Sequence, residues 1–370
     1  MNKKIILFFA VLLVISFGLG TFTGYSKLIP DSVTNDLGLK QSTNYQKTYD
    51  NSYFENNLSS IIHVNNSDDI IKLRSNLINY IWKESSLTYS KLPTNIEKNI
   101  IEQNYNDLEN LKQIDKFLVS MEHGVNSTSY LFLAQDSNNN LIIYHQSHSG
   151  DFYNGKNTIQ FFLKNGYSVL AFSMPLLGMN NQPIVDTEFG KLRLISHDYF
   201  SFIESPEFSP MKFYFEPIVL SLNYIENNFD FNNFYMVGIS GGGWTTTVYS
   251  AIDERISQSF SIAGSVPISL RIRVNDLGDY EQTLPNFYKI ANYLDLYLLA
   301  SFGEDRKHIQ IFNKNDPCCF SDDPRGIYDD EIQSTLSKLG KGKFEIHIDD
   351  THKNHKISNH ALEIILNDIK

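Results

Sequence analysis

Cysteine is nearly absent from this sequence: the 370 residues include two, and these are neighbours, Cys318 and Cys319. A disulfide between adjacent residues closes a strained ring, so we expect no disulfide framework. The cysteines and histidines show none of the short spacings that hold a structural zinc ion. The sequence therefore predicts neither a disulfide scaffold nor a metal site.

An excess of basic residues is also lacking. The chain has 31 Lys and Arg against 42 Asp and Glu, a net charge of −11. It therefore offers no basic face to a phosphate backbone, and we expect no nucleic-acid partner. The hydrophobic content of 42% and the charged content of 20% are ordinary for a globular protein. The length suits one large domain or two modest ones.

The N-terminus has the pattern of an export signal. Lys3 and Lys4 precede an uncharged apolar stretch from Ile5 to Phe22. This length suits a signal peptide or a membrane anchor at residues 1–24, and the lysines would stay cytoplasmic. An Ala-x-Ala cleavage site is missing, so we favour an uncleaved anchor that places the rest of the chain outside, over a cleaved signal and a secreted protein.

Two regions are expected between this segment and the main domain. Residues 25–66 are polar and predict a stalk. Residues 67–125 predict a helical N-terminal extension, with an amphipathic helix at Ile70 to Trp82 and a second helix from about Thr94 to Leu118.

Strands and helices alternate over residues 126–370. Buried apolar strands separated by helices predict an α/β fold, with a mostly parallel sheet and helices on both faces. The segment Ser265 to Arg306 is longer than an ordinary connection, and two readings stay open: a cap insertion that shapes a substrate pocket, or additional helical packing. The expected strands are Tyr130–Ala134, Leu141–Tyr144, Tyr167–Phe172, Phe234–Val237, Ser259–Ala263, Ile309–Phe312 and Phe344–Ile348.

The most informative motif is Gly238-Ile239-Ser240-Gly241-Gly242, between the strand that ends at Val237 and a helix from Thr245 to Asp253. A serine between glycines on a strand-to-helix turn is typical of a nucleophile elbow, which exposes the hydroxyl above the sheet. The motif predicts acyl transfer through Ser240.

A serine nucleophile needs a base that takes its proton and an acid that orients the base. In open parallel sheets such residues gather at the carboxyl ends of strands. Asp316 follows the strand Ile309–Phe312, whereas His352 and His355 follow the strand Phe344–Ile348. The chain order is therefore Ser, Asp, His.

With these residues in place, the sequence from Asn126 to Lys370 resembles the α/β-hydrolase superfamily, especially its esterase-like and dienelactone-hydrolase-like members. The resemblance implies an acid after the penultimate strand, which matches Asp316, with Asp322 and Asp323 as alternatives. It implies a base just before the last helix, which favours His355 over His352. His347 lies within a strand and His360 within the last helix, so both are expected to be structural.

The resemblance also implies an oxyanion hole of two backbone amides. Gly241, immediately after the nucleophile, supplies the first. The second is expected in the loop from His145 to Gly150, where Ser147 stands near the position of a family glycine. We favour the amide of His148, with Ser149 as the alternative.

The combined pattern predicts a serine hydrolase that cleaves a small-molecule carboxylic ester through an acyl-enzyme, without a metal or organic cofactor. Two alternatives remain open. One is a peptidase on the same fold, and the other is a surface-displayed binding protein that kept the fold and lost turnover.

Overall fold

The computed structural model describes residues 58–271, 277–318, 320 and 324–370, and divides the chain into Met1–Thr48 and Tyr49–Lys370. The apolar N-terminal segment, the stalk up to residue 57, and Asp322 and Asp323 lie outside the described residues. In the described ranges, no helix combines the length and the apolarity needed to cross a bilayer.

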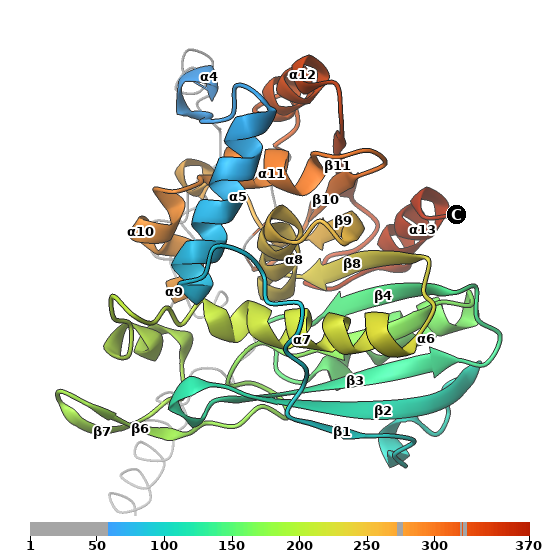
Figure 1. The fold of residues 1–370 in the computed structure, drawn as a ribbon. Coiled ribbons are helices and arrows are strands. Elements are labelled where there is room, and N and C mark those ends of the chain that lie inside the picture. Colours follow the sequence, from blue (N-terminus) through green and yellow to red (C-terminus); the bar gives the residue numbers. More distant parts are fainter. Residues whose placement is uncertain (1–57, 272–276, 319, 321–323) are drawn as a thin grey trace, which may run out of the picture. The chain divides into compact units, whose positions relative to one another are not determined.

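Nine strands of the described chain form one sheet in the order β1-β2-β3-β5-β4-β8-β9-β10-β11 (Figure 1). The strands from β5 to β11 in this order run parallel, whereas β1, β2 and β3 pair antiparallel at one side. A separate hairpin joins β6 and β7. The strands are β1 (Asn95–Glu97), β2 (Leu111–Ser120), β3 (Asn126–Ala134), β4 (Asn140–His145), β5 (Ser168–Phe172), β6 (Ile184–Thr187), β7 (Gly190–Arg193), β8 (Asn233–Ile239), β9 (Ile256–Ile262), β10 (Lys307–Asn313) and β11 (Lys343–Asp349).

The direction of each crossover determines which face of the sheet a helix covers. The step from β4 through α6 to β5 runs one way along the sheet, whereas the steps from β5 to β8, β9, β10 and β11 run the other way. Right-handed crossovers therefore place α6 on one face and α7, α8, α11 and α12 on the opposite face. The helices are α4 (Leu58–Ile61), α5 (Ser67–Trp82), α6 (Lys156–Lys164), α7 (Lys212–Asn228), α8 (Gly241–Ile252), α9 (Tyr280–Thr283), α10 (Pro285–Tyr288), α11 (Tyr293–Ser301), α12 (Asp329–Leu339) and α13 (Asn359–Asp368).

Short 3-10 turns complete the description and lie in connections between these elements. They are η1 (Gln103–Tyr105), η2 (Glu122–Gly124), η3 (Phe152–Gly155), η4 (His197–Phe202) and η5 (Ile268–Leu270).

The amphipathic helix expected near residue 70 is confirmed as α5. Asn66 caps it, because its side chain accepts from the amides of Asp68 and Asp69. Arg74 on its buried face donates to the carbonyl oxygen of Ala251, 2.9 Å away at the end of α8. Helix α5 therefore packs on the helical layer beside α8, as Figure 1 shows.

The prediction of a second helix from about Thr94 to Leu118 is wrong. This stretch contains strands β1 and β2, and β2 pairs with β3 from Leu111 to Ser120. Its apolar residues alternate with more exposed ones near the strand end, where Phe117 and Val119 are buried. Pairing with β3, the next strand along the chain, overrides the local helical spacing, so the sheet extends well before residue 126.

Two further features differ from the sequence-based expectations. The strands β3 and β4 follow one another in the chain, but β5 lies between them. Cys318 is disulfide-bonded, although a bond between neighbouring cysteines was considered too strained; its partner lies outside the described residues.

The segment 265–306 contains both kinds of structure that its sequence left open. All nine residues of α11 are buried, and this helix packs against α8 and β10 as an ordinary crossover helix. Before it, α9 and α10 follow a loop whose Asp279 reaches His148 after β4. The first part of the segment therefore approaches the carboxyl edge of the sheet, and the last part is core.

Candidate active site

The turn after β8 holds Ser240 in a strained backbone conformation. Its φ is 56° and its ψ is −122°, a region that residues with a Cβ rarely adopt. Helix α8 begins at the next residue, so its N-terminal amides lie beside the serine. Ser240 itself is only partly buried.

The glycines around Ser240 are required by close backbone contacts. A Cβ on Gly238 would lie 2.1 Å from the carbonyl oxygen of Gly242, and a Cβ on Gly242 would lie 2.1 Å from that of His145. Residues with a side chain cannot occupy these positions without moving β4 or α8. The motif is therefore a packing requirement of the elbow.

Asp316 and His355, which come from the ends of β10 and β11, lie in contact. Nδ1 of His355 is 2.6 Å from Oδ2 of Asp316, whose other oxygen accepts from the amide of Cys318 at 2.7 Å. Burial raises the pKa of Asp316, but the hydrogen bonds from His355 and Cys318 outweigh it, and the net pKa is lowered. Asp316 is therefore a buried, ionised partner for one imidazole nitrogen.

Asn313 at the end of β10 holds the two loops together. Its Nδ2 donates to the carbonyl oxygen of Lys356 at 3.0 Å, next to His355. The loop after β11 is thereby fixed against the loop that contains Asp316. Among the described residues, the hydrogen bond of the His355 ring goes to Asp316 and none joins it to Ser240. Such catalytic hydrogen bonds are often long in enzymes without bound substrate and tighten in the complex.

The other histidines have different partners. His352 lies 3.3 Å from Asp349, whose carboxylate also accepts from Thr351 and Ser358. His347 faces Glu345 at 3.1 Å, and His360 is exposed on α13. None of these three rings contacts Asp316, which leaves His355 as the imidazole paired with it.

The amides proposed for the oxyanion hole differ in their hydrogen bonds. The amides of Ser147 and Ser149 donate to Oε1 of Gln146 and to Oγ of Ser147, both at 3.1 Å. Among the described residues, the amides of Gly241 and His148 have no such acceptor. This disfavours Ser149 and leaves His148 and Gly241 with amides free to bind a substrate oxygen.

The ring of His148 packs on the elbow. A Cβ on Gly241 would lie 2.3 Å from Cε1 and 2.6 Å from Nδ1 of this ring. Its Nε2 lies 3.0 Å from both Asp279 and Glu281 and 3.3 Å from Nδ1 of His197. Burial lowers the pKa of His148, but the hydrogen bonds to the two carboxylates outweigh it and raise the pKa to about 10.

His197, Asp279 and Glu281 were not identified from the sequence. They come from η4 and from the start of α9, more than 48 residues along the chain from His148. No local spacing could have indicated them, because the fold alone brings these segments together.

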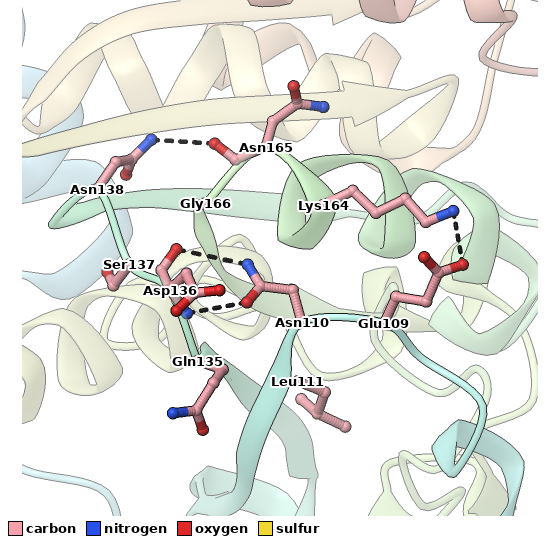
Figure 2. A pocket seen from close by; sticks show the side chains of 10 residues that line it. All are labelled: Glu109, Asn110, Leu111, Gln135, Asp136, Ser137, Asn138, Lys164, Asn165 and Gly166. Atoms are coloured by element: carbon pink, nitrogen blue, oxygen red, sulfur yellow. Dashed lines mark hydrogen bonds and ion pairs between the residues drawn. The ribbon is translucent and has the colours of Figure 1, made fainter.

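A large hollow of about 990 Å³ lies elsewhere, at the opposite edge of the sheet, where β4 and β5 begin (Figure 2). Its polar groups bind one another: Asn110 accepts from the amide of Asp136 at 2.8 Å, and Lys164 pairs with Glu109 at 2.7 Å. It contains no histidine and lies away from Ser240. We therefore do not assign the chemistry to this hollow.

No family model matches the chain, and no curated protein is similar to it in sequence. Solved structures do match. Acetyl xylan esterase from Paenibacillus sp. R4 has a TM-score of 0.54 at 12% identity, over 85% of this chain and 98% of that one. Acetyl xylan esterase 1 from Thermoanaerobacterium sp. JW/SL YS485 has a TM-score of 0.52 at 11% identity, over 82% and 93%. Glucuronoyl esterase from Solibacter usitatus has a TM-score of 0.52 at 13% identity, over 81% and 90%.

The chain has the α/β-hydrolase fold. The parallel strands, the elbow after β8 and the crossover helices on both faces agree with this assignment. In this chain the loops after β4, β8, β10 and β11 all leave the same edge of the sheet. At the identities found, the likeness concerns the fold, and the chemistry has to be argued from the residues at that edge.

Proposed function

We propose that this α/β-hydrolase cleaves a carboxylic ester through Ser240, His355 and Asp316. The observation that supports it best is the pairing of His355 with a buried, ionised Asp316, at the same sheet edge as a serine held at a strained elbow. A fold kept for packing alone would not need these three features together.

In the proposed reaction, Oγ of Ser240 attacks the ester carbonyl while Nε2 of His355 takes its proton. Asp316 holds the proton on Nδ1 and stabilises the imidazolium that forms. The amides of Gly241 and His148 bind the oxyanion. His355 then gives its proton to the leaving alcohol, and water, activated by the same imidazole, releases the acid from Ser240.

The similar structures suggest which substrates to try first. Their names specify acetyl xylan and glucuronoyl esters. Acetylated and glucuronoyl carbohydrate esters, together with short p-nitrophenyl esters, therefore form the first substrate panel for this chain.

The test is hydrolysis of p-nitrophenyl acetate combined with labelling by a fluorophosphonate probe. The wild-type chain should turn over the ester and be labelled at Ser240, and Ser240→Ala should lose both. Ser149→Ala, in the loop after β4, is the matched control and should keep both. Labelling without turnover would favour another acyl substrate such as a peptide, and absence of labelling in folded protein would favour a binding role.

We also propose that the reaction takes place outside the cytoplasm. This rests on Lys3, Lys4 and the apolar stretch from Ile5 to Phe22. In cells, an added external protease should digest the chain without lysis, and deletion of residues 1–24 should move the activity to the cytoplasm. Protection of the full chain from the protease would refute this location.

A further inference from the structure

A cluster of two histidine and two carboxylate side chains lies beside the elbow, and these side chains have no part in the proposed reaction. It consists of His148 in the loop after β4, His197 at the start of η4, Asp279 just before α9, and Glu281 within α9. The Glu281 side chain is fully buried, that of His197 is 5% exposed, and those of His148 and Asp279 are 28% and 45% exposed. We call these four residues the His-acid cluster.

One donor atom from each of the four side chains lies within 4.8 Å of the others. Nε2 of His148 lies 3.0 Å from Oδ2 of Asp279, 3.0 Å from Oε1 of Glu281 and 3.3 Å from Nδ1 of His197. Nδ1 of His197 lies 3.2 Å from Oε2 of Glu281. A tetrahedral zinc ion with bonds of about 2.0–2.1 Å separates its ligands by about 3.3 Å.

The nitrogens of the two rings that face the cluster can act as metal ligands. Nε2 of His197 lies 2.9 Å from the carbonyl oxygen of Pro175, which can only accept, so this nitrogen carries a proton, and in the neutral imidazole Nδ1 presents a lone pair. Nδ1 faces a carboxylate oxygen of Glu281 and the Nε2 of His148. Without a metal ion, a proton on each of these two nitrogens would donate to the carboxylates instead.

A divalent cation can replace these two protons, since it accepts one lone pair from each of the four residues and balances the two carboxylate charges. The surroundings also fit a metal site. The bond from His197 to Pro175 fixes the ring orientation, and the hydroxyl of Tyr214 donates to Oε2 of Glu281 at 2.8 Å. Such contacts to the atoms behind the ligands orient metal-binding side chains in other proteins.

We propose that the His-acid cluster binds one zinc ion through His148, His197, Asp279 and Glu281. Two imidazoles with two carboxylates favour zinc over magnesium or calcium, which prefer oxygen ligands alone. The ion joins three segments that the sheet does not connect directly: the loop after β4, η4 and the start of α9. It also fixes the His148 ring against Gly241.

The test is the zinc content and zinc affinity of the full chain. Protein stripped with a chelator should bind one zinc ion per chain in competition with a chromophoric chelator, and zinc should raise its melting temperature whereas magnesium should not. Cobalt(II) in place of zinc should give the intense visible absorption of a tetrahedral site. His197→Gln removes one of the four ligands, so it should lower the zinc affinity by more than about 100-fold. A loss of this size exceeds the one usual for residues that only orient the ligands.

Two further variants keep the result interpretable. Asp279→Asn changes a half-exposed ligand and should fold normally, so its loss of zinc affinity and of the cobalt spectrum does not depend on the buried His197. His347→Gln removes a histidine that faces Glu345 outside the cluster and should leave binding unchanged. Failure of the wild-type chain to bind zinc stoichiometrically, or unchanged zinc affinity in both cluster variants, would overturn the proposal.

Discussion

Replacing Asp316 with Asn tests the proposed acid of the triad most directly. The amide is nearly the same size as the carboxylate, but it removes the charge next to Nδ1 of His355, which lies 2.6 Å away. An amide NH₂ group at Oδ2 would face the N–H of His355, so the imidazole would shift its proton to Nε2. His355 could then no longer take the proton of Ser240.

The expected loss follows from this change of tautomer. In serine hydrolases built on the same triad, the comparable substitution lowers kcat about 10⁴-fold, which corresponds to about 5 kcal/mol of transition-state stabilisation. The oxyanion hole is untouched, so a weak residual activity should remain. We expect kcat for p-nitrophenyl acetate to fall between about 10³-fold and 10⁴-fold while KM changes little.

The matched control is Asp349→Asn in the loop after β11. Asp349 accepts from Thr351 and Ser358 and lies by His352, so its loss should lower the melting temperature with only a small effect on kcat. If Asp316→Asn keeps kcat within about fivefold of wild type, which corresponds to about 1 kcal/mol of activation free energy, Asp316 is not the triad acid. If Asp349→Asn shows the larger loss of kcat instead, His352 is the base.

Three predictions concern stability and are measured by chemical unfolding. Gly242→Ala should lower the free energy of unfolding by at least about 4 kcal/mol, because the new Cβ would lie 2.1 Å from the carbonyl oxygen of His145. The control Gly340→Ala, in open space at φ 74°, should lower it by only about 1 kcal/mol. Equal losses in the two variants would contradict the packing argument. Arg306→Met should lower the free energy of unfolding by about 3 kcal/mol, since the Arg306 guanidinium donates to the carbonyls of Ser250 and Leu299 near the ends of α8 and α11. A loss below about 1 kcal/mol would show that water replaces these hydrogen bonds. Burial lowers the pKa of His308 to about 3, so as the pH falls below about 6.5 this imidazole takes up a proton in the unfolded chain but not in the folded one. About 3 kcal/mol of stability should therefore be lost by pH 4. His308→Gln should show a correspondingly weaker pH dependence of stability over that range.

The sequence predicts the parts of the site that depend on local signals. Glycines around Ser240 mark the elbow because close backbone contacts exclude any side chain there. Asp316 and His355 follow apolar strands, and the carboxyl ends of parallel strands meet at one edge. The triad assignment was therefore possible before the structure, and its catalytic role stays a prediction.

The parts that were missed depend on contacts between separate segments, which local spacing does not reveal. Helical spacing in residues 94–118 gave way to the pairing of β2 with the next strand, β3. The position of β5 between β3 and β4 is a property of the whole sheet. The His-acid cluster combines three segments whose separate sequences show only isolated histidines and acids.

The backbone of Ser240 bears on the choice between an enzyme and a binding protein. At φ 56° glycine has little penalty, whereas a residue with a Cβ costs about 1 kcal/mol or more. A lineage that needed only the fold would gain stability by a drift from serine to glycine at this position, which lies in a run already rich in glycine. The serine that stands there is the less stable choice, and the proposed use of its hydroxyl gives selection a reason to keep it.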